Sequence, residues 1–284
     1  MFPGSHVPHS FNDDIIAEFR ANGGRVGGWF ENARLLLLTT TGARTGAPHT
    51  TPLGYLPDGG ERVLVIASAG GAPRDPQWFR NLLADPQVTV EDGVFTYRAR
   101  ADVLTGAERD AVFARAVAAD PGWGEYQDRA GRALPVVALE PLPGPPTPPP
   151  GPPGTALIAV HEAFRRELAL IQQEVDRAGP HVGAQLRVNC LSLCEGLHGH
   201  HEREDAGLFA WLADQRPDLA AVLARLADEH RAVAAALDEL RIVLGTPQPD
   251  REVLRREVAR LTDQVRAHLA YEEEQLVPLL NAAA

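Results

Sequence analysis

The sequence predicts two domains of different fold class, an antiparallel β-barrel of the α+β class followed by an all-α four-helix bundle. Three observations predict this organisation. Short β-type runs separated by turn signals fill the chain up to residue 140, a proline-rich stretch follows them, and the remainder is almost entirely helical in its apolar spacing. With 284 residues, 44% of them hydrophobic, the chain has enough apolar side chains for two cores.

The first domain contains six β-type runs and a few helical segments. We expect strands at residues 35–40, 49–55, 63–68, 88–90, 96–104 and 136–139. Helical patterns fit residues 15–21, 75–84 and 107–118. Turn signals such as TGARTG (41–46) and PDGG (57–60) separate the runs. Many short strands with few helices favour an antiparallel barrel.

The proline-rich stretch PLPGPPTPPPGPPG occupies residues 141–154. Proline lacks the N–H group that a helix or a strand ladder needs, so we expect polyproline II, at about 3.1 Å per residue or roughly 40 Å in all. We therefore divide the chain into a first domain (1–142), a linker (143–154) and a second domain (155–284).

The second domain has four helical apolar stripes, each with one histidine at a core position. The first helix is expected at 155–178, capped by Thr155, and the second at 183–214, with a stripe that ends on Leu208 and Trp211. The third stripe spans residues 219–237 and the fourth 254–279. The four core histidines are His161, His200, His230 and His268.

Two of these histidines are followed four residues later by a glutamate, Glu204 or Glu272. Residues four apart share one side of a helix, so each pair presents an imidazole and a carboxylate together. A single such histidine could lie on a charged surface, but four in register indicate a buried cluster, which is costly unless something binds there. Nitrogen and oxygen donors without thiolate suit iron, manganese or zinc, and carboxylates that can bridge favour two metal ions.

The composition excludes several classes of function. A net charge of −11 without an arginine-rich face excludes nucleic-acid binding. All 27 basic residues are arginine, which excludes Schiff-base chemistry, a pyridoxal phosphate anchor and a phosphate-loop lysine. No apolar run reaches about 18 residues, and the start MFPGSHVPHSFNDD lacks the basic and apolar regions of a signal peptide. We therefore expect a cytoplasmic protein with no membrane insertion.

The two cysteines, Cys190 and Cys194, lie one turn apart in a single expected helix. They cannot form a disulfide framework of the secreted kind, and a reducing compartment fits them. Cys190 falls on the apolar stripe, so it is interpreted as a small core residue, with a redox role as the alternative.

The segments HHEREDAGLF (200–209) and HLAYEEEQL (268–276) resemble the motifs of hemerythrin-like cation-binding domains, and the resemblance covers residues 155–282. It implies a four-helix bundle around a non-haem diiron centre that binds dioxygen or senses oxygen, nitric oxide or iron. The implied ligands are His161, His200, Glu204, His230, His268 and Glu272.

One position departs from that family. Its respiratory members have a second histidine four residues after the one in the third helix, where this chain has Ala234. The centre is therefore expected to be one imidazole short. His201, Asp205 and Glu273 flank the stripes; we expect them to face solvent, with substitute ligation as the alternative.

The segments LLTTTGARTGAPHTTPLGY (37–55) and ASAGGAPRDPQWFRNLLADPQV (67–88), together with PGWGEYQ (121–127), resemble the deazaflavin-dependent nitroreductase family over residues 18–142. The family has a split β-barrel fold like that of FMN-binding proteins. Its members bind reduced coenzyme F420 and pass a hydride to quinones, nitro compounds or other acceptors. Coenzyme F420 is therefore the expected cofactor, with FMN as the less favoured one.

The resemblance implies roles for individual residues. Ser68 and Tyr126 are the expected catalytic residues, and Arg44 and Arg74 would pair with the anionic tail of the cofactor. The full set of expected cofactor-binding residues is Arg44, Thr45, Thr51, Pro52, Ser68, Gly70, Gly71, Ala72, Arg74, Trp78 and Asn81. The lysine that usually follows the serine is Ala69 here, and the loss of that cation weakens anion binding.

The expected function is that of a redox protein, a deazaflavin-dependent oxidoreductase joined to a diiron domain that binds O2, NO or a related diatomic. Its partners would be a small electron acceptor such as a quinone or nitro compound and a second copy of the chain, as barrels of this type often pair. The alternative is a non-enzymatic metal-binding sensor of oxygen, redox state or iron with a degenerate cofactor barrel.

Overall fold

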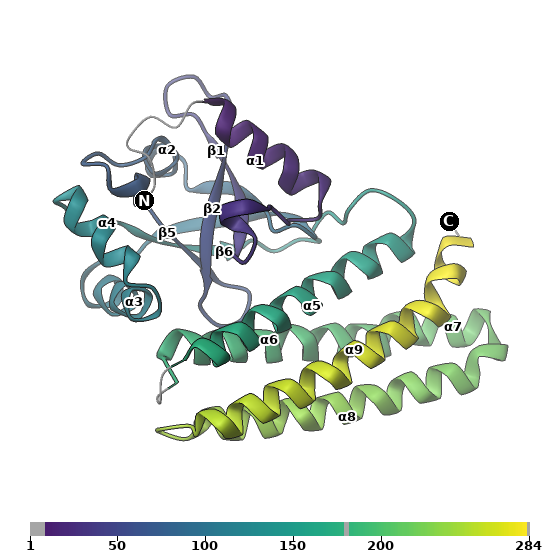
Figure 1. Ribbon diagram of the computed structural model, residues 1–284. Coiled ribbons are helices and arrows are strands. Elements are labelled where there is room, and N and C mark those ends of the chain that lie inside the picture. Colours follow the sequence, from purple (N-terminus) through teal and green to yellow (C-terminus); the bar gives the residue numbers. More distant parts are fainter. Residues whose placement is uncertain (1–8, 179–181, 283–284) are drawn as a thin grey trace. The chain divides into compact units, whose positions relative to one another are not determined.

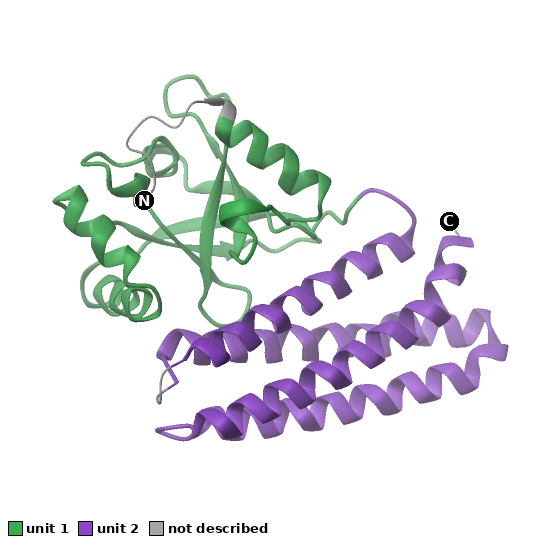
Figure 2. Ribbon diagram, viewed as in Figure 1, with its two compact units in different colours: residues 1–149 green, residues 150–284 purple. Residues whose placement is uncertain are grey.

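The computed structural model describes residues 9–178 and 182–282 of the chain. It divides into two compact units, Met1–Pro149 and Pro150–Ala284 (Figure 2). Within the described residues, no helix is both long enough and apolar enough to cross a membrane.

The first unit is a closed barrel of antiparallel strands (Figure 1). Around the barrel the strands follow the order β1-β2-β3-β6-β5-β4, so the sequence-based prediction of an antiparallel barrel is confirmed. The strands are β1 (Leu35–Thr41), β2 (Pro48–Pro57), β3 (Val63–Ile66), β4 (Gln87–Glu91), β5 (Thr96–Val103) and β6 (Val136–Pro141).

Strand β1 explains why the apolar run LLLL does not alternate with polar residues. Leu36 and Leu38 pack in the barrel interior, whereas Leu35 and Leu37 pack against Phe19 of helix α1 (His9–Ala21). Successive side chains of a strand point to opposite faces, and here both faces are covered. The other helices of this unit are α2 (Gln77–Ala84), α3 (Gly106–Ala119) and α4 (Gly122–Ala130).

Helix α4 was not predicted as a helix, because its first turn contains two glycines, which disfavour helix. Strand β3 ends two residues earlier than predicted. Ser68 has helical backbone angles and Ala69 has a positive φ of 47°, and neither conformation continues a strand.

The proline-rich stretch differs from the sequence-based expectation at both ends. Pro141 is the last residue of β6, and Thr147 pairs with Thr96 through two backbone hydrogen bonds of 2.8 and 3.0 Å. Helix α5 (Pro153–Arg177) then begins inside the expected linker. Threonine retains the N–H group that proline lacks, and proline is favoured in the first turn of a helix.

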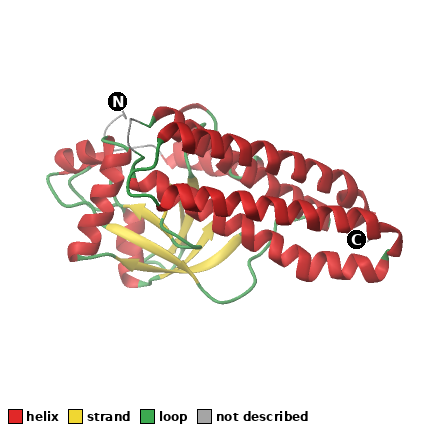
Figure 3. Cartoon of the chain, turned by 90° about the horizontal axis from the view of Figure 1, so that it is seen from below, coloured by secondary structure: helices red, strands yellow, loops and turns green. Residues whose placement is uncertain are grey.

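The second unit is a bundle of four long helices, which confirms the predicted fold class (Figures 1 and 3). Helix α5 packs against α6 and α9, and α8 packs against the same two helices. The remaining helices of the unit are α6 (Ala184–Arg203), α7 (Phe209–Gln215), α8 (Ala220–Gly245) and α9 (Arg251–Ala282). A π-helical turn (Glu204–Leu208) joins α6 directly to α7.

The π-helical turn corrects the predicted stripe of the second helix. Trp211 was expected in the core but is 47% exposed, while Phe209 and Leu212 are buried in its place. A π turn contains one residue more than an α turn, so it rotates everything that follows around the helix axis. The predicted Thr155 cap is also wrong, because Pro152 precedes the helix and Pro153 starts it.

We predict that Gly93→Ala destabilises the barrel. At Gly93, φ is +97°, and a Cβ there would lie 2.7 Å from the Cα of Gly24. Gly59 has a similar φ of +90° with no atom within 4 Å of the added Cβ, so Gly59→Ala is the matched control. The free energy of unfolding should fall by about 3 kcal/mol for Gly93→Ala and by about 1 kcal/mol for Gly59→Ala, measured by urea denaturation. Equal losses would show that the neighbouring backbone yields without cost.

Candidate functional site

The first glycine turn connects β1 to β2. The Gly46 N–H donates to the Gly42 carbonyl at 2.8 Å, and a Cβ on Gly42 would lie 2.9 Å from the Ala47 carbonyl oxygen. The turn is therefore tight at Gly42, while Arg44 and Thr45 are exposed at its tip. This leaves both predicted cofactor-binding side chains open to an anionic ligand.

Asn81 of helix α2 fixes this turn from inside the barrel. Its Nδ2 donates to Thr40 Oγ1 at 3.0 Å, and its Oδ1 accepts from the Ala43 N–H at 3.2 Å and from Gln77 Nε2 at 2.8 Å. Asn81 and its neighbour Trp78 are both buried. Asn81 thus supports the turn through hydrogen bonds, while Trp78 packs in the barrel core.

Thr51 and Pro52 lie on β2, opposite Leu38 and Leu37 of β1. Both are half-buried. Both residues therefore lie on the strand that leads away from the first glycine turn.

The second glycine loop leads from β3 to α2. Ser68 is in the right-handed helical region, and Ala69, Gly70 and Gly71 follow with φ of 47°, 63° and 82°. Ala69 is the one non-glycine residue with positive φ among the described residues. Within this loop the Gly71 N–H donates to the Ser68 carbonyl at 2.9 Å, and the Ala72 N–H donates to the Ala69 carbonyl at 3.2 Å. Ala72 returns the chain to an extended conformation.

Helix α4 holds this loop through Arg129. Its Nη1 donates to the Gly70 carbonyl at 3.3 Å, and its guanidinium lies 5.6 Å from the ring centre of Tyr126, one turn earlier. Tyr126 is half-buried, and this burial raises the pKa of its phenol. The structure thus brings Tyr126 to the side of the molecule where the Ser68 loop lies.

Arg132, just beyond α4, ties down the rest of the loop. Its Nη2 donates to the carbonyls of Ala67 at 3.2 Å and Arg74 at 3.3 Å, and its Nη1 pairs with Asp75 at 2.7 Å. The Arg74 side chain itself is exposed. Sequence reasoning missed Arg129 and Arg132, because their only signal was their position just after the motif PGWGEYQ.

In the bundle, all six residues predicted to bind metal come together. Each has an imidazole or carboxylate buried at the centre of the unit. Together with His201 they form what we call the donor cluster: His161 on α5, His200 and His201 on α6, Glu204 at the start of the π turn, His230 on α8, and His268 and Glu272 on α9.

The two carboxylates lie between imidazoles of different helices. Glu204 Oε1 is 3.2 Å from His200 Nε2, and Glu204 Oε2 is 3.7 Å from His230 Nε2. Glu272 Oε2 is 3.5 Å from the Nε2 atoms of both His161 and His268. Each glutamate therefore connects the donors of at least two helices.

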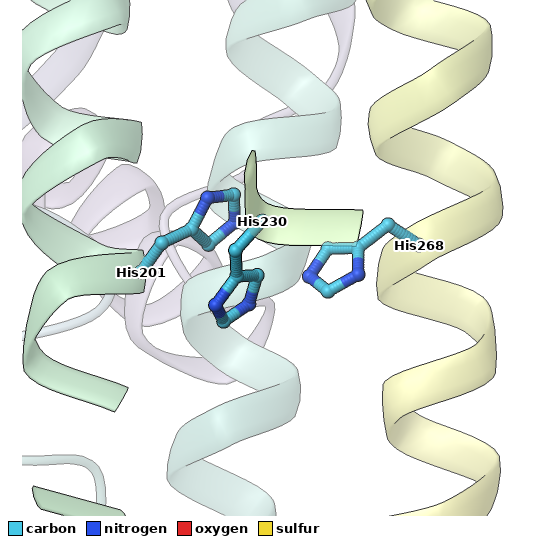
Figure 4. A group of neighbouring side chains, drawn as sticks. All are labelled: His201, His230 and His268. Atoms are coloured by element: carbon cyan, nitrogen blue, oxygen red, sulfur yellow. The ribbon is translucent and has the colours of Figure 1, made fainter. Parts of the chain in front are cut away.

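The expectation that His201 faces solvent is wrong. It is 4% exposed, and its ring stacks on His230 with centroids 4.1 Å apart and lies 5.1 Å from His268. Figure 4 shows the three rings converging from three helices. Helix α6 packs against both α5 and α8, so its buried stripe is wide enough to include two consecutive residues.

Three further carboxylates orient the imidazole rings through hydrogen bonds to their Nδ1 atoms. Glu273, Asp205 and Glu229 lie 2.9, 2.9 and 3.0 Å from the Nδ1 atoms of His161, His230 and His268, respectively. An ionised carboxylate only accepts hydrogen bonds, so each Nδ1 carries the proton and each Nε2 presents a lone pair. Asp205 and Glu273 therefore orient imidazoles instead of joining the cluster. Sequence reasoning missed Glu229, because the histidine that it contacts, His268, lies on a different helix.

The donor cluster lacks partners of its own. Among the described residues, the five Nε2 and four Oε atoms of this cluster are buried and have no hydrogen-bond partner. Buried polar atoms are rarely left unpaired without a functional reason. Metal ions bound among these atoms would give them partners, so the residues fit a metal site.

Burial also sets the protonation of the cluster. It lowers the pKa of His200 to about 2 and that of His268 to about 4, so both imidazoles are neutral near pH 7. Burial, and then the charge of Glu272, raise the pKa of Glu204 to about 10, and burial raises that of Glu272 to about 7. Two carboxylates here cannot both ionise without positive charge between them.

Comparison with known proteins identifies the barrel. Residues 14–141 match the family model described as F420H(2)-dependent quinone reductase. An F420H(2)-dependent quinone reductase of Mycobacterium tuberculosis is 36% identical over 127 residues, which cover 43% of this chain and 85% of that protein. The chain belongs to the F420H(2)-dependent quinone reductase family. It is therefore an oxidoreductase, and the expected resemblance to deazaflavin-dependent reductases is confirmed.

Two solved structures are also similar to part of this chain. One is an F420-H2 dependent reductase, 37% identical, with a TM-score of 0.35 over 38% of this chain and 94% of the other. A second, described as a domain-swapped dimer, is 33% identical, with a TM-score of 0.37 over 46% of this chain and 96% of the other.

The helical unit matches a second family model. Residues 153–280 match the hemerythrin HHE cation binding domain, as the histidine motifs predicted. This quinone reductase family member therefore carries a hemerythrin HHE domain after its barrel.

We predict that Glu229→Ala weakens metal binding by about 10–100-fold, because it removes the acceptor that fixes the His268 ring. Glu239→Ala is the matched control. Glu239 lies on the same helix, is exposed and pairs with Arg260 at the surface. Competition with a chelator for Fe(II) measures both affinities. The same affinity in both variants would mean that Glu229 does not support the cluster.

Proposed function

We propose that this chain is a redox protein with two centres. The barrel binds reduced coenzyme F420 and reduces a small acceptor of the quinone class, and the bundle holds two iron ions that bind O2, NO or a related diatomic. The barrel half rests on family membership. The bundle half rests on one observation, the nine buried donor atoms without partners. Nitro compounds remain a second class of acceptor, and manganese or zinc a second choice of metal.

In the barrel, the two glycine loops supply the contacts that the cofactor requires. When bound in its reduced form, the cofactor supplies the hydride, and the protein's task is to position it. Arg44 and Arg74, both exposed at loop tips, would pair with its phosphate and glutamate groups. The positive-φ glycines after Ser68 carry no side chain, so the loop backbone would approach the cofactor closely.

Ser68 and Tyr126 would act on the polar atoms of the reacting ring or the acceptor. The raised pKa keeps the Tyr126 phenol protonated near neutral pH, so its O–H can donate a hydrogen bond. Such a donor stabilises negative charge that develops on an acceptor oxygen during reduction.

In the bundle, Glu204 supports two metal positions rather than one. Its two oxygens face different histidines, His200 and His230, at 3.2 and 3.7 Å. Two donors that each lie about 2.1 Å from one ion are about 3–3.5 Å apart; the 3.2 Å spacing falls in this range and the 3.7 Å spacing is slightly wider, which supports one ion at each oxygen. A bridging carboxylate holds such a pair in place, and the pair supplies binding positions for a diatomic.

A metal-binding sensor with a weakened cofactor site is the second candidate, and Ala69 is the observation that favours it. The family's usual cation is absent at the point where the loop would meet an anion. The proposal also includes a homodimer and a cytoplasmic location. Two buried cysteines that form no disulfide, Cys190 and Cys194, suit that location.

The test of the proposed function is a metal count and a spectrum. The full chain is purified from iron-replete cells, metal per chain is measured, and visible spectra are recorded without oxygen before and after reduced coenzyme F420 is added. Two irons, with a quinone such as menadione reduced at the expense of the cofactor, support both halves. Two irons without cofactor oxidation support the sensor, and no bound metal contradicts the bundle half.

We predict that Ala69→Lys strengthens the binding of coenzyme F420 about 5-fold, since one restored cation beside an anion contributes about 1 kcal/mol. Ala118→Lys, on the exposed face of α3, adds the same charge elsewhere and is the control. Cofactor fluorescence quenching gives both dissociation constants. Equal strengthening by both lysines would point to net charge rather than to the loop.

A further inference from the structure

We infer that Arg109 and Gln127 are positioning residues of the barrel site, which fix the place of Tyr126 relative to Ser68. The inference rests on the proposed reductase function, in which Tyr126 and Ser68 act on the reacting groups. Neither Arg109 nor Gln127 belongs to the predicted set of cofactor-binding or catalytic residues. Both act on that site through the backbone that supports it.

Arg109 of α3 links helix α4 to the segment that leads into β6. Its Nε and Nη2 donate to the Leu134 carbonyl at 3.1 and 2.7 Å, and Nη2 also donates to Gln127 Oε1 at 2.6 Å. Its side chain is 13% exposed, and its guanidinium lies 4.3 Å from the ring centre of Phe113. Asp110 lies 3.0 Å from its Nη1, so this cation is already paired within the protein. A planar guanidinium can hold several acceptors at once, which suits Arg109 to a supporting role.

Gln127 completes the link from α4, where it directly follows Tyr126. Its Oε1 accepts a second hydrogen bond, from the Leu134 N–H at 3.2 Å. Leu134 is fully buried, and Arg109 and Gln127 together give partners to its carbonyl and its N–H. Buried backbone groups are costly to leave unpaired. Helix α4 therefore cannot slide or rotate against β6 without breaking these bonds.

The same segment also anchors the loop that begins at Ser68. The Ala67 N–H donates to the Pro135 carbonyl at 2.9 Å. Ser68 and Tyr126 are thus each next in sequence to a residue that is bonded to positions 134–135. Reactive groups must be held in a close and defined geometry, and this shared anchor sets the spacing between the two side chains.

A general loss of stability is the competing explanation for any effect of these residues. Arg115 offers a matched comparison, because it lies on the same helix as Arg109 and its side chain is 18% exposed. Its guanidinium bonds to Asp58, in the turn between β2 and β3, and not to α4. Removing either guanidinium breaks a comparable half-buried contact, but only Arg109 supports the helix that carries Tyr126.

The experiment is a kinetic comparison of full-length variants with reduced coenzyme F420 and menadione. Arg109→Gln and Gln127→Ala break the link, whereas Gln127→Glu keeps an oxygen that can accept both hydrogen bonds. Arg115→Gln is the control for stability. The turnover number, the KM for menadione and the cofactor dissociation constant are measured for each variant, and urea denaturation verifies that each is folded.

Arg109→Gln and Gln127→Ala should each lower kcat by about 10-fold, because a small displacement of a reacting group is enough for such a loss. The cofactor dissociation constant should stay at its wild-type value. Gln127→Glu and Arg115→Gln should retain the wild-type kcat. In a Tyr126→Phe background, Gln127→Ala should cause no further loss, because the phenol that it positions is already absent.

Three outcomes would overturn the inference while wild-type reduction of menadione upholds the proposed function. These are an unchanged kcat in Arg109→Gln, an equal loss in Arg109→Gln and Arg115→Gln, and a full further loss when Gln127→Ala is added to Tyr126→Phe. A wild-type kcat in Tyr126→Phe alone would overturn it as well. A wild-type chain that does not oxidise the reduced cofactor would instead overturn the reductase function, and the inference with it.

Discussion

The structure of the second unit depends on the burial of two carboxylates, Glu204 and Glu272, inside a helical bundle. Two carboxylates in a dry interior repel one another and favour protonation, as their raised pKa values show. The surrounding imidazoles are neutral and give no compensating charge. Protonation of Glu204 relieves this repulsion near neutral pH, and a bound cation would stabilise both ionised carboxylates, so metal binding is coupled to proton release.

The barrel is organised differently, because its candidate site lies on loops rather than within the core. Side chains behind the loops determine their shape: Asn81 for the first turn, and Arg129 and Arg132 for the second. The exposed residues Arg44 and Arg74 are thus positioned by hydrogen bonds to the backbone rather than by contacts of their own. A rigid support beneath exposed ligand-binding loops is the usual way in which a fold carries function.

Apolar spacing predicted the elements of both folds except helix α4, and it placed His161, His200, His230 and His268 on buried faces. Spacing failed where local geometry left the regular period. The π turn after Glu204 exposed Trp211, and the packing of α6 between two neighbours buried His201. The supporting roles of Arg129, Arg132 and Glu229 depend on partners far away in the sequence. Such pairs leave no pattern in a single sequence, whereas the four-residue spacing of His200 and Glu204 does.

The carboxylates behind the rings also connect the buried centre to solvent. The side chains of Asp205, Glu229 and Glu273 are 45%, 26% and 23% exposed, yet each accepts a hydrogen bond from an almost wholly buried imidazole. A proton on Nδ1 is therefore shared with a group that exchanges protons with water. These three carboxylates are thus the points at which the buried imidazoles come closest to solvent, and they would hold the rings in place around a bound metal ion while keeping one edge of each hydrogen bond accessible to water.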